Sequence, residues 1–302
     1  MRERKFQSWQ ELLKEFDALT GLPFVYRGQC DADWPLKTSL ERHVPKGKTC
    51  SGAEDVLIRD FKRRAHVYVP PSQLPTDDVV EWLALMQHFG APTRLLDFTE
   101  SPYVAAYFAA EDAKRAFVIW AVDTLWLTER VGAVIIDSDP RIRERFAAFV
   151  REHEALKNPP FALGAALSVG HPEDLLRNRF TIVANVEPER MNERLSIQQG
   201  AFLCPGNVDK TFLENLEAMG DSGEHVQKFI VPAAERETVL QRLRLMNITR
   251  ASLFPGLDGF AQSFRQRLLE EPEERRKARL ALRGLERALI DQALAPHEPN
   301  DR

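Results

Sequence analysis

Three separated segments of the chain hold polar residues in apolar surroundings, a pattern typical of a binding or catalytic site. The first is Tyr26-Arg27-Gly28-Gln29, where an arginine ends a short apolar run and a glycine follows it. A guanidinium is suited to bidentate recognition of phosphate or carboxylate, and a glycine lets a ligand come close to the backbone. The alternative for Arg27 is a structural salt bridge, for which Asp97 is a candidate partner.

The second segment covers residues 87–102 and is dense in polar side chains. Its candidate site residues are His88, Thr93, Arg94, Asp97, Thr99 and Ser101. Structural explanations exist as well, because a histidine can interact favourably with a helix C-terminus and a threonine or serine can cap a helix. Arg94 and Asp97 can also form an internal ion pair. Both interpretations stay open from the residues alone.

The third segment covers residues 192–203 and contains Gln198-Gln199-Gly200. The Gln198 amide can accept and donate hydrogen bonds in a cleft, or it can satisfy a neighbouring loop backbone.

Several other chemistries are not indicated. The seven histidines form no HxH, HxxxH or HExxH pair, and the three cysteines form no CxxC pair, so we expect no metal centre. GxSxG, GxGxxG and GxxxxGK[ST] motifs do not occur, which argues against a serine hydrolase, a Rossmann site and a P-loop. A formal net charge of −4 excludes a polybasic nucleic-acid coat.

We expect a cytoplasmic protein with no membrane partner. The N-terminal segment lacks the apolar core of a signal peptide, and no apolar run approaches the roughly 18 residues needed to span a bilayer.

The spacing of apolar residues predicts the elements that position the three segments. Helices are predicted up to Thr20-Gly21, over 53–67, over 79–89, from Ser101-Pro102 onward and over 141–156. Strands or extended segments are predicted over 22–28, 93–99, 116–122, 133–136, 180–184 and 227–231, with a long loop over 31–52. The helix over 53–67 is expected to bury Val56, Leu57, Phe61 and Ala65. Because strands and helices do not alternate regularly, the pattern favours an α+β fold with a mixed or antiparallel sheet.

We expect one domain over residues 1–268 and a charged helical tail over 269–302. Within the tail, Leu282, Leu285 and Leu289 have helical spacing over 273–294, amid charges of both signs. This helix either lies solvated on its own domain or binds a partner or a second copy of the chain.

Taken in order, several motifs resemble the signature of the FRG-domain family. They are Tyr26-Arg27-Gly28-Gln29, Trp34-Pro35-Leu36, Gln87-His88-Phe89-Gly90-Ala91-Pro92-Thr93-Arg94-Leu95-Leu96-Asp97-Phe98-Thr99, Arg194 with Gln198-x-Gly200-x-Phe202, and Ile248-Thr249-Arg250-Ala251-Ser252-Leu253-Phe254-Pro255-Gly256-Leu257-Asp258-Gly259. The resemblance covers residues 8 to 268, and its PTRLLD block is the most specific part.

The order of these blocks is similar to that of the ADP-ribosyltransferase superfamily. In that superfamily three blocks form an NAD⁺ cleft. They are an Arg or His on a strand, a Ser/Thr strand that is followed by a helix, and a Glu late in the sequence. The analogy implies an ADP-ribosyltransferase-like fold with Arg27, Thr99 and Gln198 as catalytic residues, Gln198 standing where a glutamate is expected. It implies no metal, and NAD⁺ contacts by Arg27, Gly28, Gln29, His88, Thr93, Arg94, Asp97 and Ser101.

By this resemblance the protein binds NAD⁺ and transfers ADP-ribose to an unknown macromolecular target, or hydrolyses NAD⁺. Toxin or anti-phage roles suit a mainly bacterial and phage family. Glutamine lacks the carboxylate that stabilises developing positive charge, so the alternative is a catalytically inactive nucleotide- or nucleic-acid-binding regulatory module. Asp97, Glu100 and Glu193 are candidates for a substitute acid.

Overall fold

The structure is a computed structural model that describes residues 1–45, 47–75, 78–138, 144, 180–188, 190–270 and 273–294. The predicted α+β class is confirmed. Strands of the described residues form one seven-stranded mixed sheet in the order β1-β7-β4-β2-β3-β6-β5. Their bounds are β1 Arg2–Lys5, β2 Phe24–Gln29, β3 Leu96–Thr99, β4 Phe117–Asp123, β5 Val183–Val186, β6 Gly200–Pro205 and β7 Val226–Val231. Among the described strands, β1 and β7 pair in parallel and the other neighbours are antiparallel.

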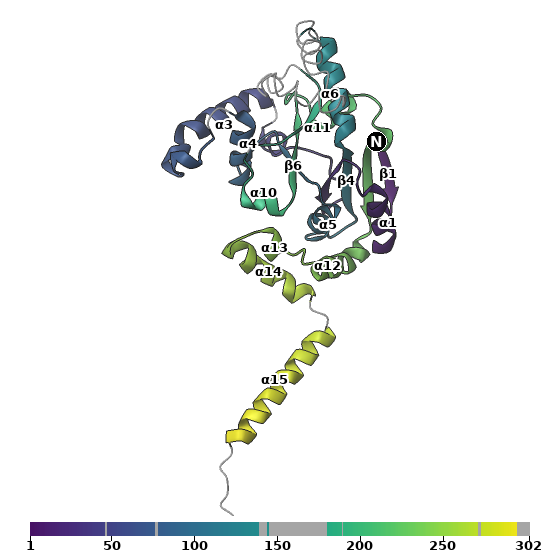
Figure 1. The fold of residues 1–302 in the computed structure, drawn as a ribbon, viewed down its shortest axis with the longest axis vertical. Helices are drawn as coiled ribbons and strands as arrows, with labels where there is room; N and C mark the ends of the chain where they lie inside the picture. The colour runs from purple at the N-terminus through teal and green to yellow at the C-terminus, as the bar shows by residue number, and fades with distance from the viewer. Residues whose placement is uncertain are drawn as a thin grey trace, which may run out of the picture. The chain divides into compact units, whose positions relative to one another are not determined.

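One face of the sheet is covered by α1 (Trp9–Leu19) and α5 (Pro102–Ala110), and α12 (Arg236–Leu245) packs against α5 (Figure 1). Aromatic rings join these layers: Phe16 of α1 contacts Tyr26 of β2 and Tyr103 of α5, with ring centroids 6.3 and 5.6 Å apart. The predicted start of α5 is confirmed, because Ser101 caps it and accepts a hydrogen bond from the backbone N–H of Val104.

The opposite face carries an extensive apolar core. Trp120 of β4 packs there with residues of α6 (Thr124–Ser138) and α11 (Phe212–Glu217), including Trp126, Leu127 and Phe212. A smaller core joins α4 (Val79–His88) to β6 and to α10 (Glu193–Ile197), which precedes β6.

Two sequence predictions about elements are wrong. Residues 133–136, predicted as a strand, belong to α6, because Leu127, Val131 and Val134 follow a helical period that faces the core. The loop predicted over 31–52 contains the short helix α2 (Ser39–His43) and the start of α3 (Cys50–Arg64).

The burial predicted for Val56 on α3 is also wrong. Its side chain is 46% exposed, and the helix buries Glu54 instead. The helix predicted over 141–156 lies outside the described residues, apart from residue 144.

The chain divides into two compact units, Met1–Ile248 and Thr249–Arg302. The second contains α13 (Arg250–Leu253), α14 (Leu257–Glu270) and α15 (Glu273–Leu294), so the predicted tail helix is present. Leu282, Leu285 and Leu289 of α15 are about 60% exposed. None of the helices that the structure describes has the length and apolar character that a bilayer crossing requires.

Candidate functional site

The ladder between β2 and β3 ends early, and the candidate site begins there. In the described sheet these strands pair only at Tyr26–Thr99, although β2 continues to Gln29 and stays paired with β4 over its full length. Beyond this point the Arg27 guanidinium makes a hydrogen bond across the gap between the two strands. Its Nη1 donates to the backbone carbonyl of Asp97 at 2.5 Å.

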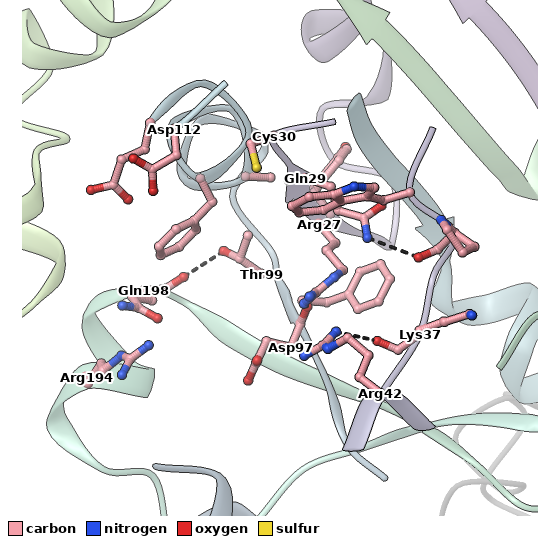
Figure 2. Close-up of a pocket in the computed structure, with 18 residues that line it drawn as sticks. Arg27, Gln29, Cys30, Lys37, Arg42, Asp97, Thr99, Asp112, Arg194 and Gln198 are labelled. Atoms are coloured by element: carbon pink, nitrogen blue, oxygen red, sulfur yellow. Dashed lines mark hydrogen bonds between the residues drawn. The ribbon is translucent and has the colours of Figure 1, made fainter. Parts of the chain in front are cut away.

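A cavity of about 740 Å³ lies beside this interrupted ladder (Figure 2). Its walls come from β2 and the loop after it, from β3, from the C-terminal turn of α5 and from α10. The basic lining residues are Arg27, Lys37, Arg42 and Arg194, and the acidic ones are Asp97, Glu111 and Asp112. Apolar surface comes from Trp34, Pro35, Phe98 and Phe108, among others. The cavity therefore combines apolar and aromatic side chains with a few polar and charged groups, a composition that is usual for small-molecule sites.

Arg27 is half-buried, and its charge is incompletely compensated. Burial lowers the pKa of Arg27, the Asp97 carboxylate raises it, and the nearby Arg42 lowers it. Its Nε is buried and has no hydrogen-bond partner among the described residues. A buried donor without an acceptor costs free energy, so the Arg27 side chain is held at this position at a cost to stability.

Thr99 and Gln198 meet at the same cavity. Thr99 Oγ1 donates to the backbone carbonyl of Gln198 at 2.6 Å and accepts from the N–H of Ser101 at 3.1 Å (Figure 2). The backbone N–H of Glu100 donates to the carbonyl of Gln199, which has a positive φ of 48°. These bonds tie the end of β3 to the turn between α10 and β6, and they hold the Gln198 side chain against the cavity.

Gly28 and Gln29 line the cavity but have structural partners. A Cβ on Gly28 would lie 2.0 Å from the carbonyl oxygen of Ala105, so this glycine lets α5 pack directly on β2. The buried Gln29 accepts from Nε1 of Trp120 at 2.7 Å and donates to the carbonyl of Pro35 at 3.3 Å. Gln29 therefore fixes the loop that carries Trp34 and Lys37.

Four of the predicted cofactor-binding residues, His88, Thr93, Arg94 and Ser101, do not line the cavity, whereas Asp97 does. Ser101 caps α5, and the buried Thr93 hydroxyl donates to Gln87 Oε1. His88 is exposed at the end of α4, and partial desolvation of its ring together with the positive charge of Arg194 lowers its pKa.

Arg94 is also placed away from the cavity. It is buried and forms an ion pair with Glu54 of α3, its Nε lying 2.9 Å from both carboxylate oxygens. The alternative Arg94–Asp97 pair is therefore replaced by Arg94–Glu54, while Asp97 accepts from Nε2 of Gln87 at 2.8 Å.

Sequence reasoning missed several cavity residues. Lys37 and Arg42 lie in the stretch expected to be a featureless loop, and the Arg42 guanidinium donates to the carbonyl of Lys37 at 2.8 Å. The sequence contains no signal for Phe108 at the end of α5 or for Glu111 and Asp112, which directly follow this helix.

Residues 23–116 match the sequence model of the FRG domain. The match contains the first three motifs of the predicted resemblance, and the motif with Gln198 and the motif over 248–259 lie beyond it. No curated protein and no solved structure matches the chain.

Proposed function

The chain carries an FRG domain over residues 23–116, and we propose that its cavity binds NAD⁺ and that the protein transfers ADP-ribose to a macromolecule or to water. The observation that carries the proposal is the meeting of Arg27, Thr99 and Gln198 at one cavity, although 171 residues separate the first from the last in sequence.

The charge of the cavity near Arg27 suits a pyrophosphate. Arg27, Lys37 and Arg42 are opposed there by the single carboxylate of Asp97, which leaves an excess of two positive charges. A dinucleotide pyrophosphate carries two negative charges, and guanidinium groups bind phosphate oxygens through charge-assisted hydrogen bonds.

The size and the apolar lining of the cavity also suit a dinucleotide. Its volume of about 740 Å³ lies within the range of roughly 300–1,000 Å³ that is usual for small-molecule sites. Trp34 lines the cavity and is 52% exposed, so it offers aromatic surface to a base. Stacking on an aromatic side chain is a common way to hold a nucleobase.

In the proposed reaction the bond between the nicotinamide nitrogen and ribose C1′ breaks. Its electron pair goes to the nicotinamide, which leaves as a neutral molecule. The acceptor, a macromolecular nucleophile or water, then forms a bond to C1′ and loses a proton. Gln198 would hydrogen bond the ribose hydroxyls, and Arg27 would hold the pyrophosphate while positive charge develops on the ribose.

A second candidate function is a nucleotide-binding module without turnover. It is favoured by the amide of Gln198, which supplies a hydrogen bond but no negative charge to the reacting ribose. Of the substitute acids proposed from the sequence, Asp97 lines the cavity, whereas Glu100 and Glu193 do not. The Asp97 carboxylate already accepts a hydrogen bond from Gln87.

Nicotinamide release from NAD⁺, followed by chromatography, tests the enzymatic proposal. Wild type should release nicotinamide, Arg27→Ala should lose at least tenfold in rate, and Gln198→Glu should gain rate because it supplies the carboxylate. Arg59→Ala, an exposed arginine of α3 outside the cavity, is the matched control and should keep the wild-type rate. No release by wild type or by Gln198→Glu, with cell lysate added as a source of acceptor, would exclude the transferase and favour the binding module.

A further inference from the structure

The end of the cavity formed by α5 has a different chemistry from the end at Arg27. Phe108, Glu111 and Asp112 line it from the last helical turn of α5 and the residues that follow. They therefore bring one half-buried aromatic ring and two carboxylates to the same end of the cavity. An aromatic face flanked by negative charge is a common binding arrangement for an organic cation.

This end of α5 is held in place by neighbouring side chains. The hydroxyl of Tyr107 donates to Oε1 of Glu111 at 3.0 Å, which orients the carboxylate. Arg236 of α12 donates to the backbone carbonyls of Ala110 and Glu111 at 2.9 and 2.6 Å. The aromatic and acidic groups thus stand at a fixed helix terminus, whose last carbonyls are already paired with the Arg236 guanidinium.

The negative charge of Asp112 acts on a group that lines the cavity. Asp112 is exposed, and its carboxylate contributes to the raised pKa of the cavity thiol of Cys30, although burial is the larger cause. The basic residues that follow, Lys114 and Arg115, do not line the cavity. Figure 2 shows Asp112 on the opposite side of the site from Lys37 and Arg42. The cavity therefore has an acidic end at Glu111 and Asp112 and a basic end at Arg27, Lys37 and Arg42, and its fourth basic residue, Arg194, lies near Gln198.

We infer that Phe108, Glu111 and Asp112 form an organic-cation site that receives the positively charged pyridinium ring of NAD⁺. The inference rests on the proposed function, because the basic end must hold the pyrophosphate for the ring to point toward α5. Only the oxidised dinucleotide carries a charge on its nicotinamide ring. These residues therefore make the cavity select NAD⁺ over NADH, and the two carboxylates are the specificity-determining groups.

The test compares dissociation constants of NAD⁺ and NADH by calorimetry for the full chain. Wild type should bind NAD⁺ about fivefold or more tightly than NADH, as expected for two partly solvated charges. The double variant Glu111→Gln/Asp112→Asn should lose this preference by weakening NAD⁺ binding alone. The matched control is Asp17→Asn, which removes an exposed carboxylate of α1 outside the cavity and should keep the preference.

A second probe separates this inference from the proposed function. The 1-methylnicotinamide cation should bind wild type more tightly than neutral nicotinamide, and the double variant should bind both equally. Equal affinity of wild type for NAD⁺ and NADH would overturn the inference while leaving the proposed function intact. If neither dinucleotide binds, the proposed function fails, and the cation site then stands only if 1-methylnicotinamide binds wild type and not the double variant.

Discussion

Replacing Gly28 by alanine should destabilise the Met1–Ile248 unit strongly. The added Cβ would lie 2.0 Å from the carbonyl oxygen of Ala105 and 2.5 Å from the backbone nitrogen of Ala109. Both atoms belong to the backbone of α5, so the clash is relieved only by shifting the whole helix off β2. Overpacking usually costs about 1–3 kcal/mol, and we expect about 3 kcal/mol because no flexible side chain can move aside. In a unit of this size, that lowers the melting temperature by about 6–12 °C.

Circular dichroism melts of wild type and Gly28→Ala measure this effect. Gly284→Ala is the matched control, because a Cβ at that position of α15 meets nothing within 4 Å. Alanine is also the better helix former, so this control should not lower the melting temperature. A fall of less than 2 °C for Gly28→Ala would refute the packing role. If the variant instead lost ligand binding without losing stability, Gly28 would serve ligand approach, as the sequence analysis expected.

Three further predictions concern buried groups. Arg94→Ala should lower the free energy of unfolding in urea by about 3–5 kcal/mol, because it leaves Glu54 buried without its cation; a loss below 1 kcal/mol would contradict this. Burial raises the pKa of Glu41 from 4.5 to about 7 in the folded protein. The free energy of unfolding therefore falls as pH rises from 4.5 to about 7, because the buried carboxyl loses its proton. Glu41→Gln stays neutral, so its free energy of unfolding minus that of wild type should be larger at pH 7.5 than at pH 5. An equal difference at the two pH values would refute the raised pKa of Glu41. Burial raises the pKa of Cys204 to about 12, so a thiol reagent should label Cys30 in the native protein and Cys204 only after unfolding.

The sequence predicted the elements whose signals are local. The Ser101-Pro102 start of α5 and the end of α4 before Gly90, which has a φ of 84°, depend on neighbouring residues alone. The strand predicted over 133–136 failed because a β-branched run was weighed above the longer helical period of α6. Tertiary packing on the sheet decides between the two, and one sequence does not show that packing.

The candidate site was predictable to a similar extent. The residue types and the order of the motifs brought Arg27, Thr99 and Gln198 together as candidates, and all three line one cavity. The same motifs also contain Arg94, whose role depends on Glu54, 40 residues earlier in the chain. Asp112, at the acidic end of the cavity, directly follows α5. The sequence of this helix is apolar and contains no signal for a binding site.

Equilibrium binding of NAD⁺ to wild type and to Arg27→Ala tests the central claim most directly. The account predicts saturable binding by wild type, at least tenfold weaker binding by Arg27→Ala, and unchanged binding by Arg59→Ala. The melting temperature of Arg27→Ala should stay within about 3 °C of wild type, because losing its bond to Asp97 is offset by relief of a buried charge. Absence of NAD⁺ binding to folded wild type, or equal affinity of wild type and Arg27→Ala, would contradict the account.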